Sequence, residues 1–334
     1  MPNSGDSIPP KPRHSDVIRT ADPQAIEDAG RLIRDGRLVA FPTETVYGLG
    51  ADATNGEAVA RIFLAKGRPH FNPLIVHVPN VDHAAALGQF SGVANQLAAA
   101  FWPGPLTLVV PRHQNSGISE LVSAGLPTLA IRVPDHPIAQ ALLRSAARPL
   151  AAPSANRSGH ISATLAGHVA ADLGTSVAMI LDGGATVHGL ESTVVDATGG
   201  DIIILRPGAI SVAPLVDVLG RKVRRTAPGS SEAPISPGQL ASHYAPRAAI
   251  RLNAHHVTPG EALLAFGGSE LDTNGPSFNL SPSGSLIEAA ANLFAALRNL
   301  DATGVAAIAV MPIPESGLGE AINDRLQRAA APRT

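Results

Sequence analysis

The chain has 334 residues, of which 45% are hydrophobic and 16% are charged, with a formal net charge of −2. This length suits one large domain and a smaller one, because single cores stop growing at roughly 250 to 300 residues, and the near-neutral charge excludes a strong overall attraction to nucleic acid or anionic membranes. Cysteine is absent, which excludes disulfides, thiolate nucleophiles and sulfur-bound zinc.

The first residues carry no signal for export or membrane insertion. Residues 1–16 are polar and proline-rich, which predicts a disordered extension. They lack the apolar run of about 7 to 15 residues that a signal peptide needs, and no uninterrupted stretch of about 18 apolar residues follows them. The sequence therefore predicts a cytoplasmic protein that does not span a membrane.

Helical and strand-like segments alternate from there on. The first helix is marked by Asp22 as N-cap, Pro23 at its first position and Gly36 as its stop, and an apolar strand at 38–41 follows it. Further helices are predicted at 58–65 and 138–145, and further strands at 74–78, 106–110, 128–133, 177–181, 193–195 and 202–205. This alternation predicts an α/β domain over residues 17–220 with a twisted, mixed sheet.

A second domain follows a linker. Residues 221–246 are rich in Pro, Ser and Gly and have no hydrophobic periodicity, which predicts a linker. Residues 247–334 predict a small Rossmann-like α/β domain whose strands are parallel. Its predicted elements are strands at 249–252, 262–266 and 305–311 and helices at 286–300 and 320–329.

Small polar loops follow several of the predicted strands. Residues 42–50, PTETVYGLG, lie where α/β proteins place binding loops, but their Gly-x-Gly lacks the third glycine and the helix of a dinucleotide site, so we reject an NAD site here. The loops at 152–159, 189–196 and 205–208 are similar in character. The two threonines and the carboxylate of 42–50 could hydrogen-bond a polar amino-acid ligand or simply cap a turn. The hydroxyls and backbone N–H groups of the other three loops could bind an anion or could form turns and caps.

Cationic side chains accompany these loops. Lys66 and Arg68 lie where a helix ends, and they could bind an anion or merely complement the negative end of the helix dipole beside the helix stop Gly67. Arg132 and Arg206 supply planar guanidinium groups suited to carboxylate or phosphate. These four cations are candidates for an anionic substrate site.

Two further observations limit the chemistry. His77, within an apolar run, is either a hydrogen-bonded core histidine or a ligand contact. No His-Glu-x-x-His metal motif is present, and we expect His255 and His256 to be a polar pair on the surface. No Ser-His-Asp arrangement is evident, so a nucleophilic mechanism has little support.

The ordered set of motifs resembles the YrdC-like family of threonylcarbamoyladenylate synthases, in its two-domain form. The motifs that carry the resemblance are PTETVYGLGADA at 42–53, KGRPHFNPLIVHV at 66–78, FWPGPLTLVV at 101–110, APSANRSG at 152–159, GLESTVVD at 189–196, LRPGAI at 205–210 and PGQLASHYAP at 237–246. A single motif could mislead, but seven in order form a specific signal.

The resemblance implies synthesis of L-threonylcarbamoyladenylate from L-threonine, bicarbonate and ATP by a nucleotidyltransferase that releases pyrophosphate. It implies Lys66 and Arg68 as catalytic residues at the triphosphate and the bicarbonate-derived carbonyl, and Tyr244 with His243 as a lid over the nucleotide. The implied ATP-binding residues are Arg68, Asn72, Ser154, Ser162, Arg206, Tyr244 and, on weaker grounds, Thr128. The implied threonine-binding residues are Thr45, His77, Arg132, Ala152 and Ser192.

The implied reaction brings several anions together. Positioning and charge neutralisation can supply most of the catalysis without a covalent intermediate. Mg²⁺ is expected with ATP, held by phosphate oxygens and water, and no protein-bound metal is expected. The product would pass to a tRNA threonylcarbamoyl transferase machinery, for modification next to the anticodon.

Two alternatives stay open at this point. A non-catalytic RNA-binding module would need aromatic side chains on which bases can stack, and an aromatic content of 3% provides few of them. Direct tRNA binding is therefore the weaker expectation. A carbamoyl transferase accessory of the hydrogenase-maturation type would carry zinc-finger cysteines, which are absent. The sequence does not indicate the role of the C-terminal domain.

Overall fold

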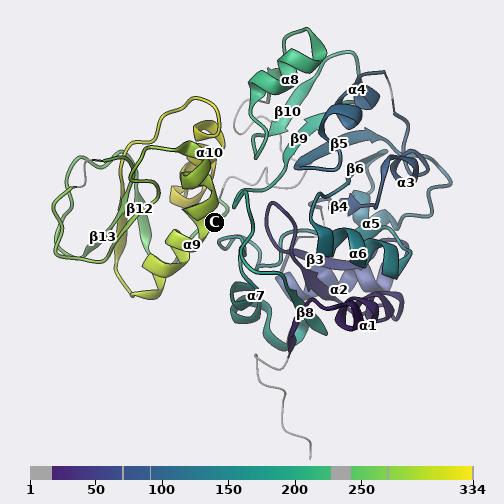
Figure 1. Cartoon of the computed structure of the whole chain (residues 1–334), viewed down its shortest axis with the longest axis horizontal. Coiled ribbons are helices and arrows are strands. Elements are labelled where there is room, and N and C mark those ends of the chain that lie inside the picture. The colour runs from purple at the N-terminus through teal and green to yellow at the C-terminus, as the bar shows by residue number, and fades with distance from the viewer. Residues whose placement is uncertain (1–16, 70, 91, 227–241, 269–270, 333–334) are drawn as a thin grey trace, which may run out of the picture.

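The chain forms a large and a small α/β body that lie side by side (Figure 1). The computed structural model describes residues 17–69, 71–90, 92–226, 242–268 and 271–332. The predicted extension at 1–16, His70 of the second motif and residues 227–241 of the predicted linker lie outside the described residues.

The large body is built on one mixed sheet. Its strands are β1 (Ile18–Thr20), β2 (Val39–Phe41), β3 (Gly48–Asp52), β4 (Ile75–His77), β5 (Leu106–Pro111), β6 (Thr128–Arg132), β7 (Leu150–Ala151), β8 (Met179–Asp182), β9 (Thr193–Asp196), β10 (Ile203–Arg206) and β11 (Arg224–Arg225). Their order across the sheet is β1-β8-β2-β3-β7-β4-β6-β5-β9-β10-β11. β4 pairs with β6 in parallel and β5 with β6 antiparallel, so the prediction of a mixed sheet is confirmed.

Helices cover both faces of this sheet. They are α1 (Pro23–Arg34), α2 (Gly56–Lys66), α3 (Val81–Ala85), α4 (Gly92–Phe101), α5 (Glu120–Ser123), α6 (Pro137–Ala146), α7 (Ala166–Leu173) followed by the 3₁₀ turn η2 (Gly174–Ser176), and α8 (Val212–Leu219). One apolar cluster joins α1 and α6 to β2 and β8, and a larger one joins α2, α4, α5 and α7 to the central strands. The sheet is therefore buried on both sides, as its apolar strands require.

The first helix shows how local sequence sets an element. The Asp22 side chain accepts a hydrogen bond of 2.7 Å from the Ala25 backbone N–H, and Pro23 occupies the first helical turn. The helix buries Ala29 and Ile33 on one face, four residues apart. The cap, the proline and the apolar spacing that predicted this helix are therefore all present in the structure.

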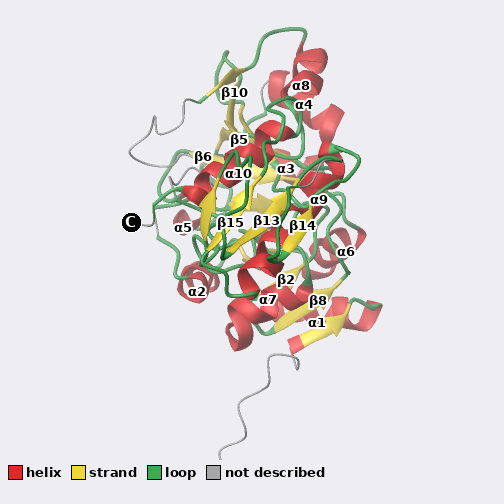
Figure 2. Ribbon diagram, turned by 90° about the vertical axis from the view of Figure 1, so that its left-hand side faces the viewer, coloured by secondary structure: helices red, strands yellow, loops and turns green. Residues whose placement is uncertain are grey.

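The small body contains a parallel sheet covered by two helices. Its elements are β12 (Ala249–Arg251), β13 (Glu261–Ala265), β14 (Ser277–Asn279), α9 (Leu286–Ala302), β15 (Ala307–Val310) and α10 (Gly319–Ala330). All three strand pairings in the order β12-β15-β13-β14 are parallel, as predicted. Figure 1 shows α9 and α10 between this sheet and the large body, and Figure 2 looks from the side of the small body, with β15, β13 and β14 side by side.

The two bodies share apolar packing. The core of the small body includes Val46, Ile161 and Leu190, which belong to three loops of the large body. Tyr244, from the segment that connects the bodies, is also part of this core. The small body is thus packed directly on the polar loops that the sequence singled out.

Each predicted helix and strand is present, with ends that differ by at most two residues. The sequence missed mainly short or weakly signalled elements, such as β3, whose sequence GLGAD has no β-branched residue, and α7, which has no side-chain cap. Residues 224–225, predicted as linker, instead pair in parallel with β10 as β11. Among the described residues, no helix is long and apolar enough to cross a membrane.

Candidate active site

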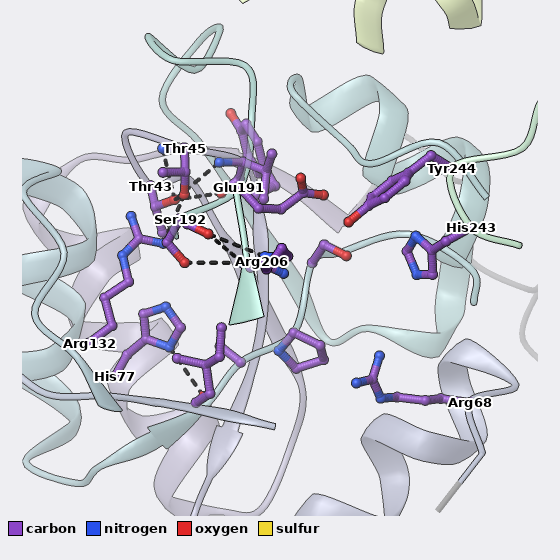
Figure 3. Close-up of a pocket in the computed structure, with 17 residues that line it drawn as sticks. Thr43, Thr45, Arg68, His77, Arg132, Glu191, Ser192, Arg206, His243 and Tyr244 are labelled. Atoms are coloured by element: carbon purple, nitrogen blue, oxygen red, sulfur yellow. Dashed lines mark hydrogen bonds between the residues drawn. The ribbon is translucent and has the colours of Figure 1, made fainter. Parts of the chain in front are cut away.

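A buried pocket of about 50 Å³ lies where loops of the large body meet the residues that precede the small body (Figure 3). The residues that line it are Thr43, Thr45, Val46, Tyr47, Gly48, Arg68, Ile75, His77, Arg132, Ala152, Pro153, Ser154, Glu191, Ser192, Arg206, His243 and Tyr244. In Figure 3, Arg132, His77 and Thr45 lie on one side of the pocket and Arg68, His243 and Tyr244 on the other. The pocket has two distinct ends.

Arg132 is fixed at the first end. It is the last residue of β6 and is only 4% exposed. Its Nη1 donates to Thr45 Oγ1 at 2.8 Å, its Nη2 to Glu44 Oε1 at 2.6 Å and its Nε to the Gly104 carbonyl at 3.3 Å. Three acceptors thus orient one guanidinium, which is how a site for a carboxylate is preorganised.

Glu44 is the buried partner that balances this cation. Burial alone would raise the pKa of the Glu44 carboxyl, but the charge and hydrogen bond of Arg132 outweigh burial and hold the pKa below its usual value. Within the part of the chain that the structure describes, the Oε2 atom of Glu44 is buried without a hydrogen-bond partner. The sequence analysis did not assign Glu44, although it stands between the two threonines of the first motif.

His77 lies beside Arg132 in the register of β4 and β6. It is 3% exposed, lines the pocket, and its Nδ1 lies 3.3 Å from the Ile75 carbonyl. Burial, followed by the charge of Arg132, lowers the pKa of His77 to about 3. The imidazole is therefore neutral near pH 7, and it is both a core residue and part of the pocket wall.

Ser192 and Arg206 connect the two ends. Arg206 Nη2 donates to the Ser192 carbonyl at 2.8 Å and to its Oγ at 3.1 Å. The same Oγ lies 2.7 Å from Thr107 Oγ1. These contacts join the 189–196 and 205–208 loops at the pocket, where both were expected to act.

Arg68 lines the second end of the pocket, and Asn72 lies behind it as its hydrogen-bond partner. Arg68 donates from Nε to the Asn72 carbonyl at 3.3 Å and from Nη2 to the Pro73 carbonyl at 3.0 Å, and burial, with the charge of Arg206 second, lowers its pKa to about 10. The Asn72 amide is fully buried, yet neither its Nδ2 nor its Oδ1 has a hydrogen-bond partner among the described residues. Leaving such a group unpaired costs about 1–3 kcal/mol, which a polar ligand could recover.

Four of the expected site residues do not line the pocket: Lys66, Asn72, Thr128 and Ser162. Thr128 begins β6, four residues before Arg132 and hence roughly 13 Å away along the strand, so the structure does not bring it to this site. Ser162 reaches the site indirectly, because its Oγ donates at 2.6 Å to Oε1 of Glu191, which does line the pocket.

Lys66 hydrogen-bonds a neighbouring loop. Its Nζ donates to the carbonyl of Ser154 at 2.6 Å and to the carbonyl of Asn156. Burial, followed by the charge of Arg68, holds the pKa of Lys66 well below its usual value. In this geometry Lys66 shapes the 152–159 loop, whose Ser154 lines the pocket.

The remaining expected residues meet in the pocket. These are Thr45, Arg68, His77, Arg132, Ala152, Ser154, Ser192, Arg206 and Tyr244. Thr43, Glu44 and Glu191 are not among the expected site residues, although all three stand in motifs that carry the resemblance. Arg325, far along the chain, is not among them either, and its Nε donates to Glu191 Oε2 at 2.9 Å.

The buried histidines predict a loss of stability in mild acid. The pKa of His77 and of His243 falls to about 3 through burial, against an ordinary value of 6.5. Between these values the unfolded chain binds more protons, so the free energy of unfolding falls as pH is lowered from about 6.5, by up to about 1.4 kcal/mol per pH unit for each histidine. Urea unfolding between pH 7 and 5 measures this slope.

His77→Asn should reduce that slope by nearly one proton, and His256→Asn, on the surface, should leave it unchanged. The window above pH 5 keeps Glu191 out of the measurement: its folded pKa is about 2, so its contribution is lost only below the unfolded value of 4.5. An unchanged slope in His77→Asn would show that this imidazole is not buried in its neutral form.

The comparisons with known proteins match both bodies of the chain. The family model Sua5_yciO_yrdC, described as telomere recombination, matches residues 31–208, and the model described as the threonylcarbamoyl-AMP synthase C-terminal domain matches residues 210–331. The threonylcarbamoyl-AMP synthase of Pyrococcus abyssi is 40% identical over 92% of this chain and 94% of its own, and that of Bacillus subtilis is 40% identical over 96% of each chain.

A solved structure has the same two-domain architecture. The crystal structure of P. abyssi Sua5 complexed with L-threonine superposes with a TM-score of 0.86 at 38% identity, and it covers 94% of this chain and 96% of its own. Both domains are therefore matched in sequence and in fold. The chain belongs to the two-domain threonylcarbamoyl-AMP synthase family.

Proposed function

We propose that this chain synthesises L-threonylcarbamoyl-AMP from L-threonine, bicarbonate and MgATP, with release of pyrophosphate, as a nucleotidyltransferase. The observation that carries the proposal is the pocket itself, with an oriented arginine at one end and two further arginines toward the other. Two synthases are about 40% identical over nearly the whole chain, and a similar protein was solved with L-threonine. The product would serve the threonylcarbamoyladenosine modification of tRNA in the cytoplasm.

The Arg132 end suits the amino acid. Arg132 would bind the threonine carboxylate, because its guanidinium is already oriented by Thr45 and Glu44. The neutral His77 and the Ser192 hydroxyl lie on the same pocket wall and can hydrogen-bond the side-chain hydroxyl or the amine. The amine would attack bicarbonate to give a carbamate and water.

The Arg68 end suits the nucleotide. The carbamate oxygen would attack the α-phosphorus of ATP, and the bond to the pyrophosphate leaving group would break. Arg68 and Arg206 can neutralise the charge that develops, in a site from which water is largely excluded. Lys66 could join them only by leaving the carbonyls of Ser154 and Asn156.

Binding of ATP requires the pocket to widen. Its volume of about 50 Å³ is well below the roughly 300–1,000 Å³ of small-molecule sites. His243 and Tyr244 line the Arg68 end and come from the connecting segment (Figure 3). We propose that they move to admit the nucleotide and close over it.

The proposed Mg²⁺ enters with ATP, on phosphate oxygens and water. The described residues contain no group of three or more His, Cys, Asp or Glu side chains that could hold a metal ion. Glu191, the carboxylate in the pocket wall, is engaged by Arg325 and Ser162.

Pyrophosphate release by the purified protein tests the proposal. With ATP, Mg²⁺ and bicarbonate present, we expect release that depends on L-threonine and falls at least about tenfold with L-serine, because one methyl group is worth about 1–3 kcal/mol in a fitted pocket. Mass spectrometry should identify the adenylate. Turnover without threonine, or no turnover together with salt-sensitive binding of RNA, would contradict the proposal and favour an RNA-binding module.

A further inference from the structure

The small body contacts the pocket through two loops of the large body. One of them begins at Gly189, where the backbone carbonyls of Ala290 and Ala291 in α9 approach so closely that a Cβ would stand 2.5 Å from each. No flexible side chain separates the two bodies at this point. The 189–192 loop is therefore in direct contact with α9, and it carries Glu191 and Ser192 into the pocket.

Arg325 reaches the same loop from α10. It is fully buried, and its Nε donates to Glu191 Oε2 at 2.9 Å. Its Nη1 donates at 2.7 Å to Asp324, and its guanidinium carbon lies 5.2 Å from the centre of the Tyr244 ring. One side chain of the small body thus contacts both a pocket carboxylate and the aromatic ring that lines the Arg68 end.

Glu191 connects Arg325 to Ser162, because its other carboxylate oxygen accepts a hydrogen bond of 2.6 Å from the Ser162 hydroxyl. Arg298 of α9 hydrogen-bonds the backbone of the same serine. It donates to the carbonyls of Ile161 and Ser162, the latter at 3.3 Å, and pairs with Asp172 at 2.7 Å. Two arginines of the small body therefore converge on Ser162, one through its main chain and one through Glu191.

Tyr244 also contacts α9. Its ring stacks on Phe294 of α9, with centroids 5.5 Å apart and an interplanar angle of 24°. The ring is 1% exposed and contacts both Phe294 and the Arg325 guanidinium. Aromatic stacking and a cation over an aromatic ring are both favourable contacts, so two helices of the small body help to hold this ring.

We propose that Arg325 and Arg298 are positioning residues through which the docked small domain sets the geometry of the nucleotide end of the pocket. This inference rests on the proposed synthase function. Buried ion pairs contribute little net stability relative to apolar packing, whereas they can fix one arrangement of the groups they join. The arrangement fixed here is that of Glu191, Ser162 and Tyr244, all at or next to the pocket.

Kinetics of the full-length protein test the inference. In Arg325→Met we expect KM for ATP to rise about tenfold and kcat to fall, with KM for L-threonine changed less than about twofold, because Arg132 and its partners are untouched. Arg298→Met should give the same pattern, and it keeps the test valid if Arg325→Met does not fold. Arg251→Met is the matched control, since it removes an Arg–Glu pair of the same domain, Arg251–Glu261, and should keep the wild-type constants.

Hydrogen–deuterium exchange adds a readout that does not depend on turnover. In both variants, amides of residues 159–164 and 189–192 should exchange faster, while β4–β6 stay protected. Equal rises in both Michaelis constants, or wild-type kinetics in both variants, would overturn the inference. If wild-type protein shows no turnover, the proposed function fails, and unchanged exchange in these two loops would then overturn the positioning role by itself.

Discussion

Replacing Arg132 with alanine is expected to lower kcat/KM for L-threonine by roughly 10²–10³-fold, the loss seen when one preorganised charge-assisted contact is removed. The reason is geometric, because Thr45 and Glu44 hold the guanidinium in the pocket wall before any substrate arrives. The pyrophosphate assay with varied threonine measures the loss. Saturation with ATP should be affected far less, since Arg68 and Arg206 remain.

The same substitution leaves Glu44 as a buried carboxylate without its cation. Removing one partner of a buried pair costs about 3–5 kcal/mol, so Arg132→Ala should also unfold at lower urea concentration. Adding Glu44→Gln removes the orphaned charge, and the double variant should regain part of the stability but none of the activity. Arg144→Ala, an exposed arginine on α6, should match wild type in both measurements.

These outcomes separate substrate binding from folding. If the double variant regained activity together with stability, the loss in Arg132→Ala would reflect misfolding, and Arg132 would not be the carboxylate contact. If Arg132→Ala alone kept wild-type kcat/KM for threonine, the Arg132 end of the pocket would not be the threonine end.

The sequence predicted those parts of the fold that depend on local signals. The cap at Asp22 and the apolar spacing after it, or the four apolar residues among the first five of β5, need no knowledge of distant residues. β3 gave no such signal, because Gly48 and Gly50 lower strand propensity and its pairing with β2 and β7 supplies what propensity lacks.

The site was predictable where a motif carried the residue, and not where the contact was long-range. Thr45, His77 and Ser192 stand in motifs, Arg132 lies in a predicted strand, and the four do meet in one pocket. Glu44 was not predicted, because an acidic residue is not expected beside a site for anions. Its role becomes clear only from the structure, in which it forms an ion pair with Arg132. Arg325 had no signal at all, since its pairing with Glu191 spans 134 residues and crosses from one body to the other.

Substitution of Gly208 has a large expected effect on folding. A Cβ at this position would stand 2.5 Å from the Glu191 carbonyl oxygen, the Ser192 carbonyl carbon and the Thr193 nitrogen. All three are backbone atoms, so no side chain can turn away. Alanine would have to push apart the loop that carries Glu191 and Ser192 and the strand end that carries Arg206, at a cost of about 3 kcal/mol or more.

Gly208→Ala should therefore be strongly destabilised in urea unfolding, and any folded fraction should lack threonine-dependent pyrophosphate release, because the pocket loops have moved. Gly199→Ala is the matched control, as a Cβ there meets no heavy atom within 4 Å and should change stability by less than about 0.5 kcal/mol. Near-wild-type stability in Gly208→Ala would mean that the two loops are farther apart than this packing requires, and the contact between Arg206 and Ser192 would then have to be formed in another way.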